Sequence, residues 1–558
     1  MLRISDIKLG TDDTESDLRK KVLKLLGVKN VKSFEISKKS IDARKKPDIH
    51  YVYSVDVETD NEEYYAKKIK NSQILKKKTY EFPKCGKFDK PVVIVGTGPA
   101  GLMCGLTLAQ NGYKVILLER GKCVEERMKD VEAFWEAGFL NPESNVQFGE
   151  GGAGTFSDGK LTTGIKDFRI RKVLEEFHKH GAPKEILYYS KPHVGTDNLS
   201  KMVASIRSEI RKLGSEVRFS NKLVNVKTDN GEICGAVVES DSGEYVIETN
   251  NIVLAIGHSA RDTFLMLQNR NIAMEQKSFS VGARIEHSQE MINKSQYGKA
   301  YKKLPAADYK MAVHLESGRG VYTFCMCPGG FIVPAASGPE QVVVNGMSPA
   351  NRGSRWSNSG MVVEIQPEDL GNEELKMRNE ELAAQQDEQL MALNPNLKSS
   401  QLSEINSQLL SVLHFQEELE RQCWLQGGRR QTAPAQRMLD FTRKKLSYNL
   451  PESSYSPGLI SSPLHFWMPS FISKRLSLGF QQFGRSSHGF LTNEAVMIGV
   501  ETRTSSPVRI IRDKDTLQHV TVRGLFPCGE GAGYAGGIVS AGVDGERCAE
   551  AVANYFNH

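Results

Sequence analysis

The chain has 558 residues, too many for one simple core, so we expect two or three domains. Hydrophobic residues make up 39% and charged residues 25%, as in an ordinary globular protein, and no uninterrupted apolar run reaches the roughly 20 residues of a membrane span. The net charge is +6, yet residues 1–90 alone carry 22 Lys and Arg against 15 Asp and Glu, so the basic character belongs to the first domain.

Cysteine usage and the N-terminus bear on location. Nine cysteines are scattered along the chain without a CxxC pair. This pattern argues against a disulfide framework and against a zinc site, so we predict no metal. The first residues have no apolar signal core, and a reducing cytoplasm is the simplest location.

Residues 1–75 predict a small α/β domain. The predicted strands are 2–9, 31–42 and 49–58, and the predicted helices are 15–27 and 61–70. This β-α-β-β-α order favours a ferredoxin-like fold. Residues 76–90 are basic and punctuated by Pro and Gly, which is typical of a linker.

Residues 91–120 carry the strongest motif. An apolar strand, Val92 to Val95, runs into Gly96-x-Gly98-x-x-Gly101, and an apolar helix and a second strand ending in Glu119 follow. Gly96 permits the tight turn, Gly98 lets the backbone approach a pyrophosphate, and Gly101 lets the helix pack on the sheet. The helix N-terminus attracts the pyrophosphate, and Glu119 can accept both ribose hydroxyls. The alternative is a glycine-rich turn without a ligand. We assign to the cofactor Gly96, Gly98, Pro99, Ala100, Gly101, Glu119 and Arg120.

The next glycine-rich segment, residues 149–155, has too many glycines for the interior of a helix or strand. Such a loop can wrap a planar or phosphate-bearing ligand with its backbone N–H groups. We therefore expect Gly151, Gly152 and Thr155 to contact the pyrophosphate and the isoalloxazine ring. The alternative is a flexible surface loop.

A strand within residues 247–263 ends in Ala255-Ile256-Gly257. It resembles the ATG strand that returns to the dinucleotide domain in two-domain flavoproteins, where Gly257 would let the chain pass near the adenosine and pyrophosphate. Ile256 replaces the middle residue of that pattern, which removes a hydroxyl and keeps the glycine.

The C-terminal segment favours FAD over NAD. Residues 524–545 predict a short strand, then Gly529-Glu530-Gly531, then a glycine-rich turn that opens a helix. In flavoproteins an acidic residue at this place hydrogen-bonds the ribityl chain, and the helix dipole stabilises negative charge on the reduced flavin. The alternative is a glycine-rich loop before an ordinary buried helix. The residues assigned to FAD here are Gly529, Glu530, Gly536, Gly537 and Ile538.

The chain resembles the bacterial FAD-dependent dehydrogenases, most of which are uncharacterised. The resemblance covers nearly the whole sequence and implies FAD binding and a redox role without naming a substrate. The segments that carry it are 149–161, 192–197, 256–263, 324–333, 345–360, 427–441, 501–510 and the C-terminal Gly-Glu motif.

These patterns predict an α/β chain with a Rossmann-like FAD-binding domain built from 91–275 and 480–558. A β-rich and helical substrate domain, 276–479, is inserted between the two parts, and the ferredoxin-like domain precedes them. Long helices are predicted within 367–447. No second GxGxxG unit is present, so NAD(P)H would bind only transiently at the flavin face.

The sequence offers fewer candidates for catalysis than for cofactor binding. Arg503 can clamp a substrate carboxylate with Glu501 to orient it, or the two can form a structural ion pair. His193 can act as an acid or base, although a lone histidine more often satisfies a core hydrogen bond, and His258 fits a supporting role. Cys325 and Cys327 can form a redox pair, but a regular strand holds them near the upper limit for a bridge, so two small buried residues are favoured.

The leading hypothesis is an FAD-dependent oxidoreductase that transfers a hydride between a small-molecule substrate and flavin N5. An RNA-associated flavoprotein is the alternative, because Lys38, Lys39, Arg44, Lys45 and Lys46 can contact phosphates. A lysine-rich face is usually only solvated, and no aromatic stacking signature accompanies it, so nucleic acid is disfavoured. An NAD-only dehydrogenase is the third possibility and predicts a colourless protein.

Overall fold

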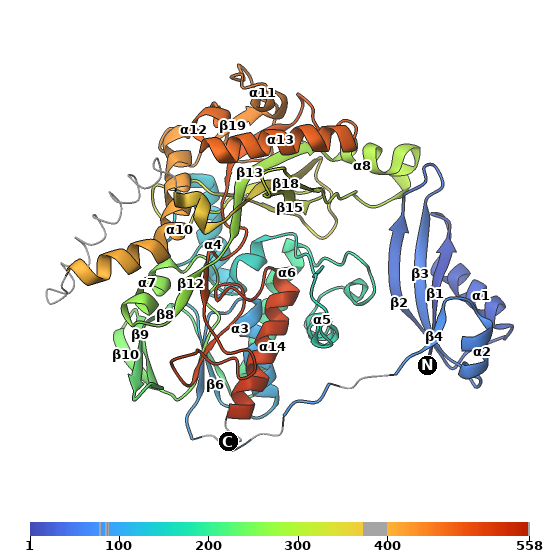
Figure 1. Ribbon diagram of the computed structural model, residues 1–558. Helices are drawn as coiled ribbons and strands as arrows, with labels where there is room; N and C mark the ends of the chain where they lie inside the picture. Colours follow the sequence, from blue (N-terminus) through green and yellow to red (C-terminus); the bar gives the residue numbers. More distant parts are fainter. Residues whose placement is uncertain (77–79, 84–85, 87–88, 372–398, 556–558) are drawn as a thin grey trace.

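The structure is a computed structural model that describes residues 1–76, 80–83, 86, 89–371 and 399–555. Figure 1 shows a large body and a small N-terminal domain beside it. Within the described residues, no helix has both the length and the apolar character needed to cross a membrane.

The N-terminal domain is a four-stranded antiparallel sheet in the order β2-β3-β1-β4, with two helices. Its elements are β1 (Leu2–Leu9), α1 (Glu15–Leu26), β2 (Ser33–Asp42), β3 (His50–Glu58), α2 (Glu62–Lys68) and β4 (Ser72–Ile74). Thr14 and Asp17 form a capping box at the start of α1, and Gly27, with φ of 69°, ends the helix. The five predicted elements are observed in their predicted order, and β4 is added.

The large body contains a five-stranded parallel sheet in the order β23-β11-β5-β6-β7. Its strands are β5 (Val92–Val95), β6 (Val115–Leu118), β7 (Glu216–Arg218), β11 (Ile252–Leu254) and β23 (Leu525–Pro527). Segments more than 400 residues apart, β5 and β23, therefore share one sheet. Both faces of β5 are buried: Val92 and Ile94 face one hydrophobic cluster, and Val93 and Val95 face another.

Helices cover one face of this sheet and a three-stranded antiparallel sheet covers the other. The helical side consists of α3 (Pro99–Gln110), α5 (Arg169–Lys179), α6 (Thr196–Lys212) and α14 (Ile538–Tyr555), and the other sheet of β8 (Asn221–Asp229), β9 (Glu232–Ser240) and β10 (Gly243–Glu248). Helices α3 and α14 lie side by side (Figure 1). Their close approach requires Gly545, whose Cβ would lie 2.2 Å from the Ala100 carbonyl oxygen.

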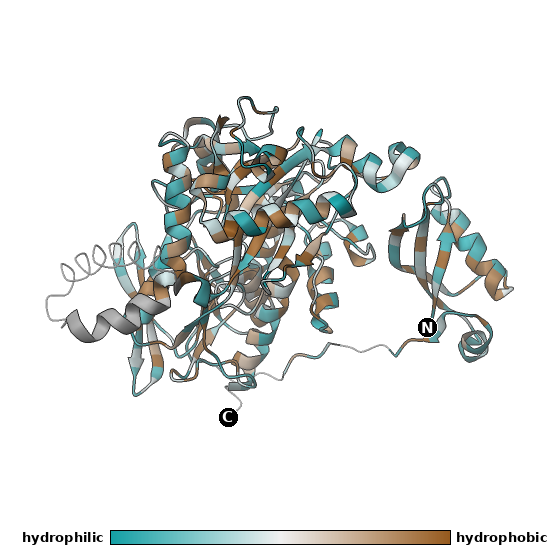
Figure 2. Cartoon of the chain, turned by 45° about the horizontal axis from the view of Figure 1, so that its top comes forward, coloured by the Kyte–Doolittle hydropathy of each residue, from teal (hydrophilic) through white to brown (hydrophobic). Residues whose placement is uncertain are grey.

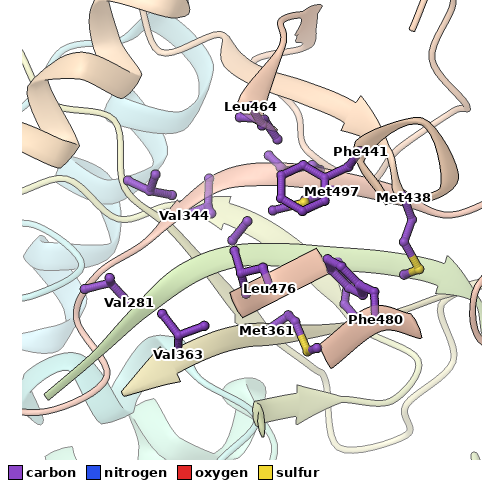
Figure 3. Close-up of a cluster of buried hydrophobic side chains, with 14 of the residues drawn as sticks. Val281, Val344, Met361, Val363, Met438, Phe441, Leu464, Leu476, Phe480 and Met497 are labelled. Carbon is purple, nitrogen blue, oxygen red and sulfur yellow. The ribbon is translucent and has the colours of Figure 1, made fainter. Parts of the chain in front are cut away.

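A seven-stranded sheet in the order β14-β15-β18-β13-β21-β19-β20 forms the upper half of the body. Its strands are β13 (Phe279–Ser288), β14 (Ala312–His314), β15 (Gly320–Cys327), β18 (Trp356–Ile365), β19 (Ala433–Arg437), β20 (Leu459–Ser461) and β21 (Val496–Glu501). Helix α13 (Ser470–Ser486) packs across it, and Figure 3 shows Leu476 and Phe480 of this helix over Met361 and Val363 of β18. Figure 2 shows hydrophobic residues concentrated inside the body and hydrophilic residues outside.

The remaining elements connect these layers. They are α4 (Val124–Ala137), η1 (Gly152–Phe156), η2 (Lys184–Leu187), α7 (Arg261–Asn269), β12 (Met274–Gln276), α8 (Gln289–Tyr297), η3 (Gly298–Lys303), β16 (Phe331–Pro334), β17 (Val344–Met347), η4 (Pro367–Gly371), α10 (Ser399–Gln426), α11 (Met438–Thr442), α12 (Leu464–Trp467) and β22 (Val508–Ile510). The helix predicted after residue 367 falls mostly on 372–398, outside the described residues, and the second predicted long helix is observed as α10.

The predicted boundary between residues 479 and 480 is wrong. It falls inside α13, and β21 beyond it pairs with β13 in the seven-stranded sheet. The chain returns to the first part of the body only with β22, which pairs with β12. The sequence did not reveal this because an apolar strand such as 496–501 fits either sheet.

The N-terminal domain contacts the body through the edge strand β2. The Lys39 N–H donates to the Tyr188 carbonyl oxygen at 2.8 Å, and the Ser190 N–H donates to the Lys39 carbonyl oxygen at 2.9 Å. The Lys39 ammonium lies 4.8 Å from the centre of the Tyr51 ring and 5.2 Å from that of Tyr189. Lys39, predicted as part of a phosphate-binding cluster, thus lies at a contact within the chain.

Candidate functional site

A cavity of about 340 Å³ opens at the carboxyl ends of the parallel strands. This edge is where open α/β sheets bind their ligands. Leu118 of β6 and Glu530, which follows β23, both line the cavity. In the sheet, β6 and β23 lie on opposite sides of β5 and β11, and three inter-strand steps of ~4.8 Å separate them by roughly 14 Å. The predicted site residues that line the cavity are Gly96, Gly98, Pro99, Ala100, Glu119, Arg120, Gly152, Gly257, Glu501, Arg503, Glu530, Gly536, Gly537 and Ile538.

The turn between β5 and α3 uses its three glycines differently. Gly96 has φ of 99°, and its Cβ would lie 2.3 Å from the Ala255 carbonyl oxygen. At Gly98 a Cβ would have no protein atom closer than 4.0 Å, so its space belongs to the cavity. Gly101 does not line the cavity, and its Cβ would lie 1.9 Å from the Gly96 carbonyl oxygen. That Cβ would also lie 3.5 Å from the Ile94 Cγ2 of β5, so the absence of a side chain at Gly101 allows α3 to pack closely on the strand, which agrees with the prediction.

The turn before α14 ends in two glycines that also leave free space. A Cβ at Gly536 or Gly537 would meet nothing within 4 Å, and the same holds for Gly257, whose φ is 72°. These glycines and Gly98 leave cavity space beside the N-termini of α3 and α14. Helix N-termini present N–H groups without helical partners, which suits an anionic or electron-rich ligand at each.

Gly529 supports this region from behind. It does not line the cavity; its N–H donates to Asp544 at 2.8 Å, and its Cβ would lie 2.7 Å from that of Ala100. It therefore packs the end of β23 against α3, which differs from the predicted direct contact with a cofactor.

The loop 149–155 lies between the two helix starts. A Cβ at Gly152 would lie 3.2 Å from the Gly98 Cα, and one at Gly154 would lie 3.4 Å from the Ile538 Cγ1. Gly151 and Thr155, both predicted to contact a ligand, face each other instead, since a Cβ at Gly151 would lie 2.0 Å from the Thr155 Oγ1. The predicted role is thus supported by position for Gly152 and not for the other two.

Glu119 is almost fully buried and already accepts four hydrogen bonds. The Thr97 N–H and hydroxyl donate to one carboxylate oxygen at 3.0 and 2.7 Å, and the N–H groups of Gly121 and Gly149 donate to the other, both at 3.0 Å. A carboxylate has about four acceptor positions, so all are used. Glu119 fixes the surrounding turns, and accepting ribose hydroxyls as predicted would require exchanging one of these bonds.

Arg120 lines the same end of the cavity and is held by two acidic side chains. It donates to Glu143 at 2.6 Å and to both oxygens of Asp262 at 2.8 and 2.9 Å. Burial alone would raise the pKa of Asp262, but hydrogen bonds from Arg120 and Lys222 outweigh it and lower that pKa to about 2. The guanidinium carbon lies 4.1 Å from the centre of the Phe148 ring.

Glu530 and His258 meet at the opposite end. His258 Nε2 lies 3.9 Å from a Glu530 carboxylate oxygen. Burial, with the charges of Arg503 and Arg261, lowers the pKa of His258 to about 3, so the imidazole is neutral. Burial raises the pKa of Glu530 to about 7, although Lys277 opposes the shift. Glu530 is therefore the group that gains or loses a proton near neutral pH.

Arg503 and Glu501 do not form the predicted pair. Arg503 donates to Glu420 at 3.0 and 3.1 Å, and it also donates to Ser259 and Gln341. Glu501 pairs instead with Arg284 at 2.7 Å. With its donors engaged by the protein, Arg503 has a structural ion-pair role rather than the substrate clamp that the sequence suggested.

His193 lies outside the cavity. Its Nε2 is 3.1 Å from the Ala350 carbonyl oxygen, and burial lowers its pKa. This geometry matches a histidine that satisfies a local hydrogen bond and does not support the predicted acid–base role.

Three residues of the inserted part support the site and were not predicted from the sequence. Arg284 is fully buried behind the cavity, Glu420 joins Arg261 to Arg503, and Asn345 lines the cavity wall. The signal available was a charged residue in the apolar strand 279–288, which required a partner once buried.

Cys528, Asp544 and Cys548 place ligand atoms within 4.8 Å of one another. Arg512, however, donates to both oxygens of Asp544 at 2.9 and 2.7 Å and lies 3.6 Å from the Cys548 sulfur. A fixed cation in this group disfavours a metal ion, and we assign none to it.

Three family models match the chain. Residues 90–295 match the pyridine nucleotide-disulphide oxidoreductase family, and residues 278–504 match a family described as FAD-dependent protein, C-terminal domain-like. Residues 1–58 match a domain of unknown function. The second match ends three residues after β21.

Two of the relatives found by sequence are described here. An uncharacterized protein of Clostridium beijerinckii is 41% identical over 100% of this chain and 99% of its own length. A digeranylgeranylglycerophospholipid reductase of Methanocella arvoryzae is 23% identical over 31% of this chain and 40% of its own length.

Solved structures show only low similarity. A triple mutant of the flavin-dependent brominase Bmp2 is 13% identical and covers 84% of this chain and 80% of that one, with a TM-score of 0.35. THI4 of Thermovibrio ammonificans is 21% identical and covers 34% and 66%, with a TM-score of 0.23. These values do not bear on the reaction.

Proposed function

Because the chain belongs to a family of FAD-dependent oxidoreductases that includes the Clostridium beijerinckii protein, we propose that it transfers a hydride between a small organic substrate and N5 of bound FAD. The observation that carries the proposal is the single cavity that the α3 and α14 N-termini share, with Gly98, Gly536 and Gly537 leaving room beside them. Bound FAD supplies the hydride chemistry.

We propose that the adenosine half lies at the β6 end and the isoalloxazine ring at the β23 end. The distance of roughly 14 Å between these two strands suits an extended dinucleotide. Gly98 and the α3 N-terminus would receive the pyrophosphate, and Arg120 would border the adenosine. Gly536, Gly537 and the α14 N-terminus would face the ring edge that becomes negative on reduction.

Two residues at the β23 end of the cavity, Glu530 and His258, differ in whether they can exchange a proton near neutral pH. Glu530 can hold or release a proton at its carboxyl group near pH 7, and His258 beside it stays neutral. Phe324 and Cys325 of β15, together with Thr504, bring the inserted part onto this end and exclude water from part of it. We propose that the substrate binds here, between the two parts of the body.

We further propose that residues 91–275 and about 505–558 form the FAD domain, and that 276–504 form the substrate domain. The β-α-β-β-α-β order and the sheet order β2-β3-β1-β4 support a ferredoxin-like fold for residues 1–75. No observation favours the RNA-binding alternative: Arg44 pairs with Asp42, and Lys46 donates to the Ser295 carbonyl oxygen.

Cofactor content and reduction test the proposal. Purified protein should be yellow and should release FAD on heating, and anaerobic mixing with NADH, NADPH and a metabolite panel should bleach the flavin with at least one donor. Protein that carries no flavin and takes none up from solution would contradict it.

A further inference from the structure

Strand β15 is irregular where its two cysteines lie. The pairing of β15 with β18 shifts register between Phe324 and Cys327, which places Cys325 and Met326 in a bulge. Cys325 has φ of 42°, a left-handed conformation that is uncommon outside glycine. The extended spacing that argued against a bridge in a regular strand therefore does not apply to this pair.

The two thiols have different surroundings. Cys325 lines the cavity, as do Lys160 and Glu530, whereas Cys327 is completely buried behind it. The Cys327 thiol also lies 3.3 Å from the Cys325 carbonyl oxygen. Cys325 thus faces the proposed flavin end of the cavity, and Cys327 lies in the buried layer behind Cys325.

Arg284 fixes this arrangement. Its Nη2 donates to the Cys325 carbonyl oxygen at 2.6 Å and to the Cys327 sulfur at 3.4 Å. Glu501 at 2.7 Å and Asn358 at 2.8 Å hold the guanidinium in place. A hydrogen bond from the Cys327 thiol, aided by the charge of Arg284, lowers the pKa of Cys325, and the same contact raises the pKa of Cys327.

We propose that Cys325 and Cys327 are a redox dithiol that exchanges two electrons with the bound flavin, which rests on the proposed function. The Cys325 thiolate and the Cys327 thiol lose two electrons to oxidised flavin and form one S–S bond. The thiol proton passes to the flavin, which becomes the reduced anion, so atoms and charge balance. The pair lies in β15, outside residues 90–295 that match the disulphide oxidoreductase family.

Peptide mapping gives a direct readout of the pair. Trypsin releases Gly320–Arg352, a peptide that contains both cysteines and no other. Full-length FAD-loaded protein is oxidised in air or reduced anaerobically with dithionite, then denatured in an alkylating agent. We expect the peptide to take up no alkyl group from the oxidised protein and two from the reduced protein.

Reductive titration gives the electron count. Wild-type protein should accept four electrons per FAD, and Cys325→Ser and Cys327→Ser should each accept two. Cys234→Ser, in β9 and away from the cavity, is the matched control and should accept four. The wild-type data alone decide the matter where a variant does not fold.

FAD-loaded wild-type protein that accepts only two electrons, and whose oxidised peptide takes up two alkyl groups, would overturn this inference alone. Protein that binds no FAD would overturn the proposed function and this inference with it.

Discussion

The Glu501 carboxylate lies 2.7 Å from the Arg284 guanidinium, and 3% or less of either side chain is exposed. Arg503, two residues along the chain, is held instead by Glu420. The segment 501–503 therefore carries two separate buried ion pairs: one supports the Cys325–Cys327 bulge, and the other joins α10 to the cavity wall.

Glu501→Gln should destabilise the protein by about 3 kcal/mol, because it leaves the Arg284 charge buried without its counter-ion. The free energy of unfolding, measured with urea, checks this. Glu494→Gln, at an exposed position just before the same strand, is the control and should change stability by less than about 0.5 kcal/mol. Equal effects of the two substitutions would contradict the assignment.

Glu420→Gln should be at least as costly, about 3–5 kcal/mol, because Glu420 is the shared partner of two buried arginines, Arg261 and Arg503. Glu417 also approaches Arg261, at 3.4 Å, but is partly exposed. Glu417→Gln should therefore cost less than about 1 kcal/mol. If thermal denaturation ranks the two variants in the reverse order, the buried network is not the main support of this wall.

Gly98→Ala and Gly101→Ala should separate cofactor binding from folding. A Cβ at Gly98 would have no protein atom closer than 4.0 Å and φ is −69°, so the apoprotein should keep its stability within about 1 kcal/mol while FAD affinity falls. A Cβ at Gly101 would lie 1.9 Å from the Gly96 carbonyl oxygen, so that variant should lose stability. Fluorescence titration with FAD and urea unfolding of apoprotein measure the two effects. Unchanged FAD affinity in Gly98→Ala would argue against the pyrophosphate position.

The pH dependence of stability should report Glu530. Its folded pKa of about 7 lies above the ordinary value, so the folded state prefers the protonated form. Stability from this group is fully present below about pH 4 and is lost as pH rises through 7, by about 3 kcal/mol in total. Glu530→Gln should remove this loss, so the variant should gain stability relative to wild type between pH 5 and pH 8. A constant difference between the two proteins over that range would disprove the raised pKa.

Backbone geometry could be predicted from the sequence where a local pattern is compatible with only one conformation. The apolar strand before Gly96, the glycines beside the helix starts, and the strand and helix after residue 524 each determine backbone geometry locally. Both glycine-rich turns line one cavity because β5 and β23 share a parallel sheet, an arrangement that the motif predicted.

The ion-pair partners of the buried charged residues could not be predicted from local sequence patterns. Glu501 and Arg503 are neighbours in sequence, yet their partners come from β13 and α10, and only the tertiary packing sets these distances. Thr155 and Gly151 share a loop with Gly152 but turn away from the cavity, since the 3₁₀ turn there points successive residues in different directions. The bulge at Cys325 depends on pairing with β18, which no local pattern encodes.

A crystal structure of the FAD-loaded protein would show where the cofactor binds. We expect one extended FAD molecule with its pyrophosphate at Gly98 and its isoalloxazine ring between Gly536 and Cys325. A flavin bound elsewhere, or one whose ring lies at the Arg120 end, would contradict it.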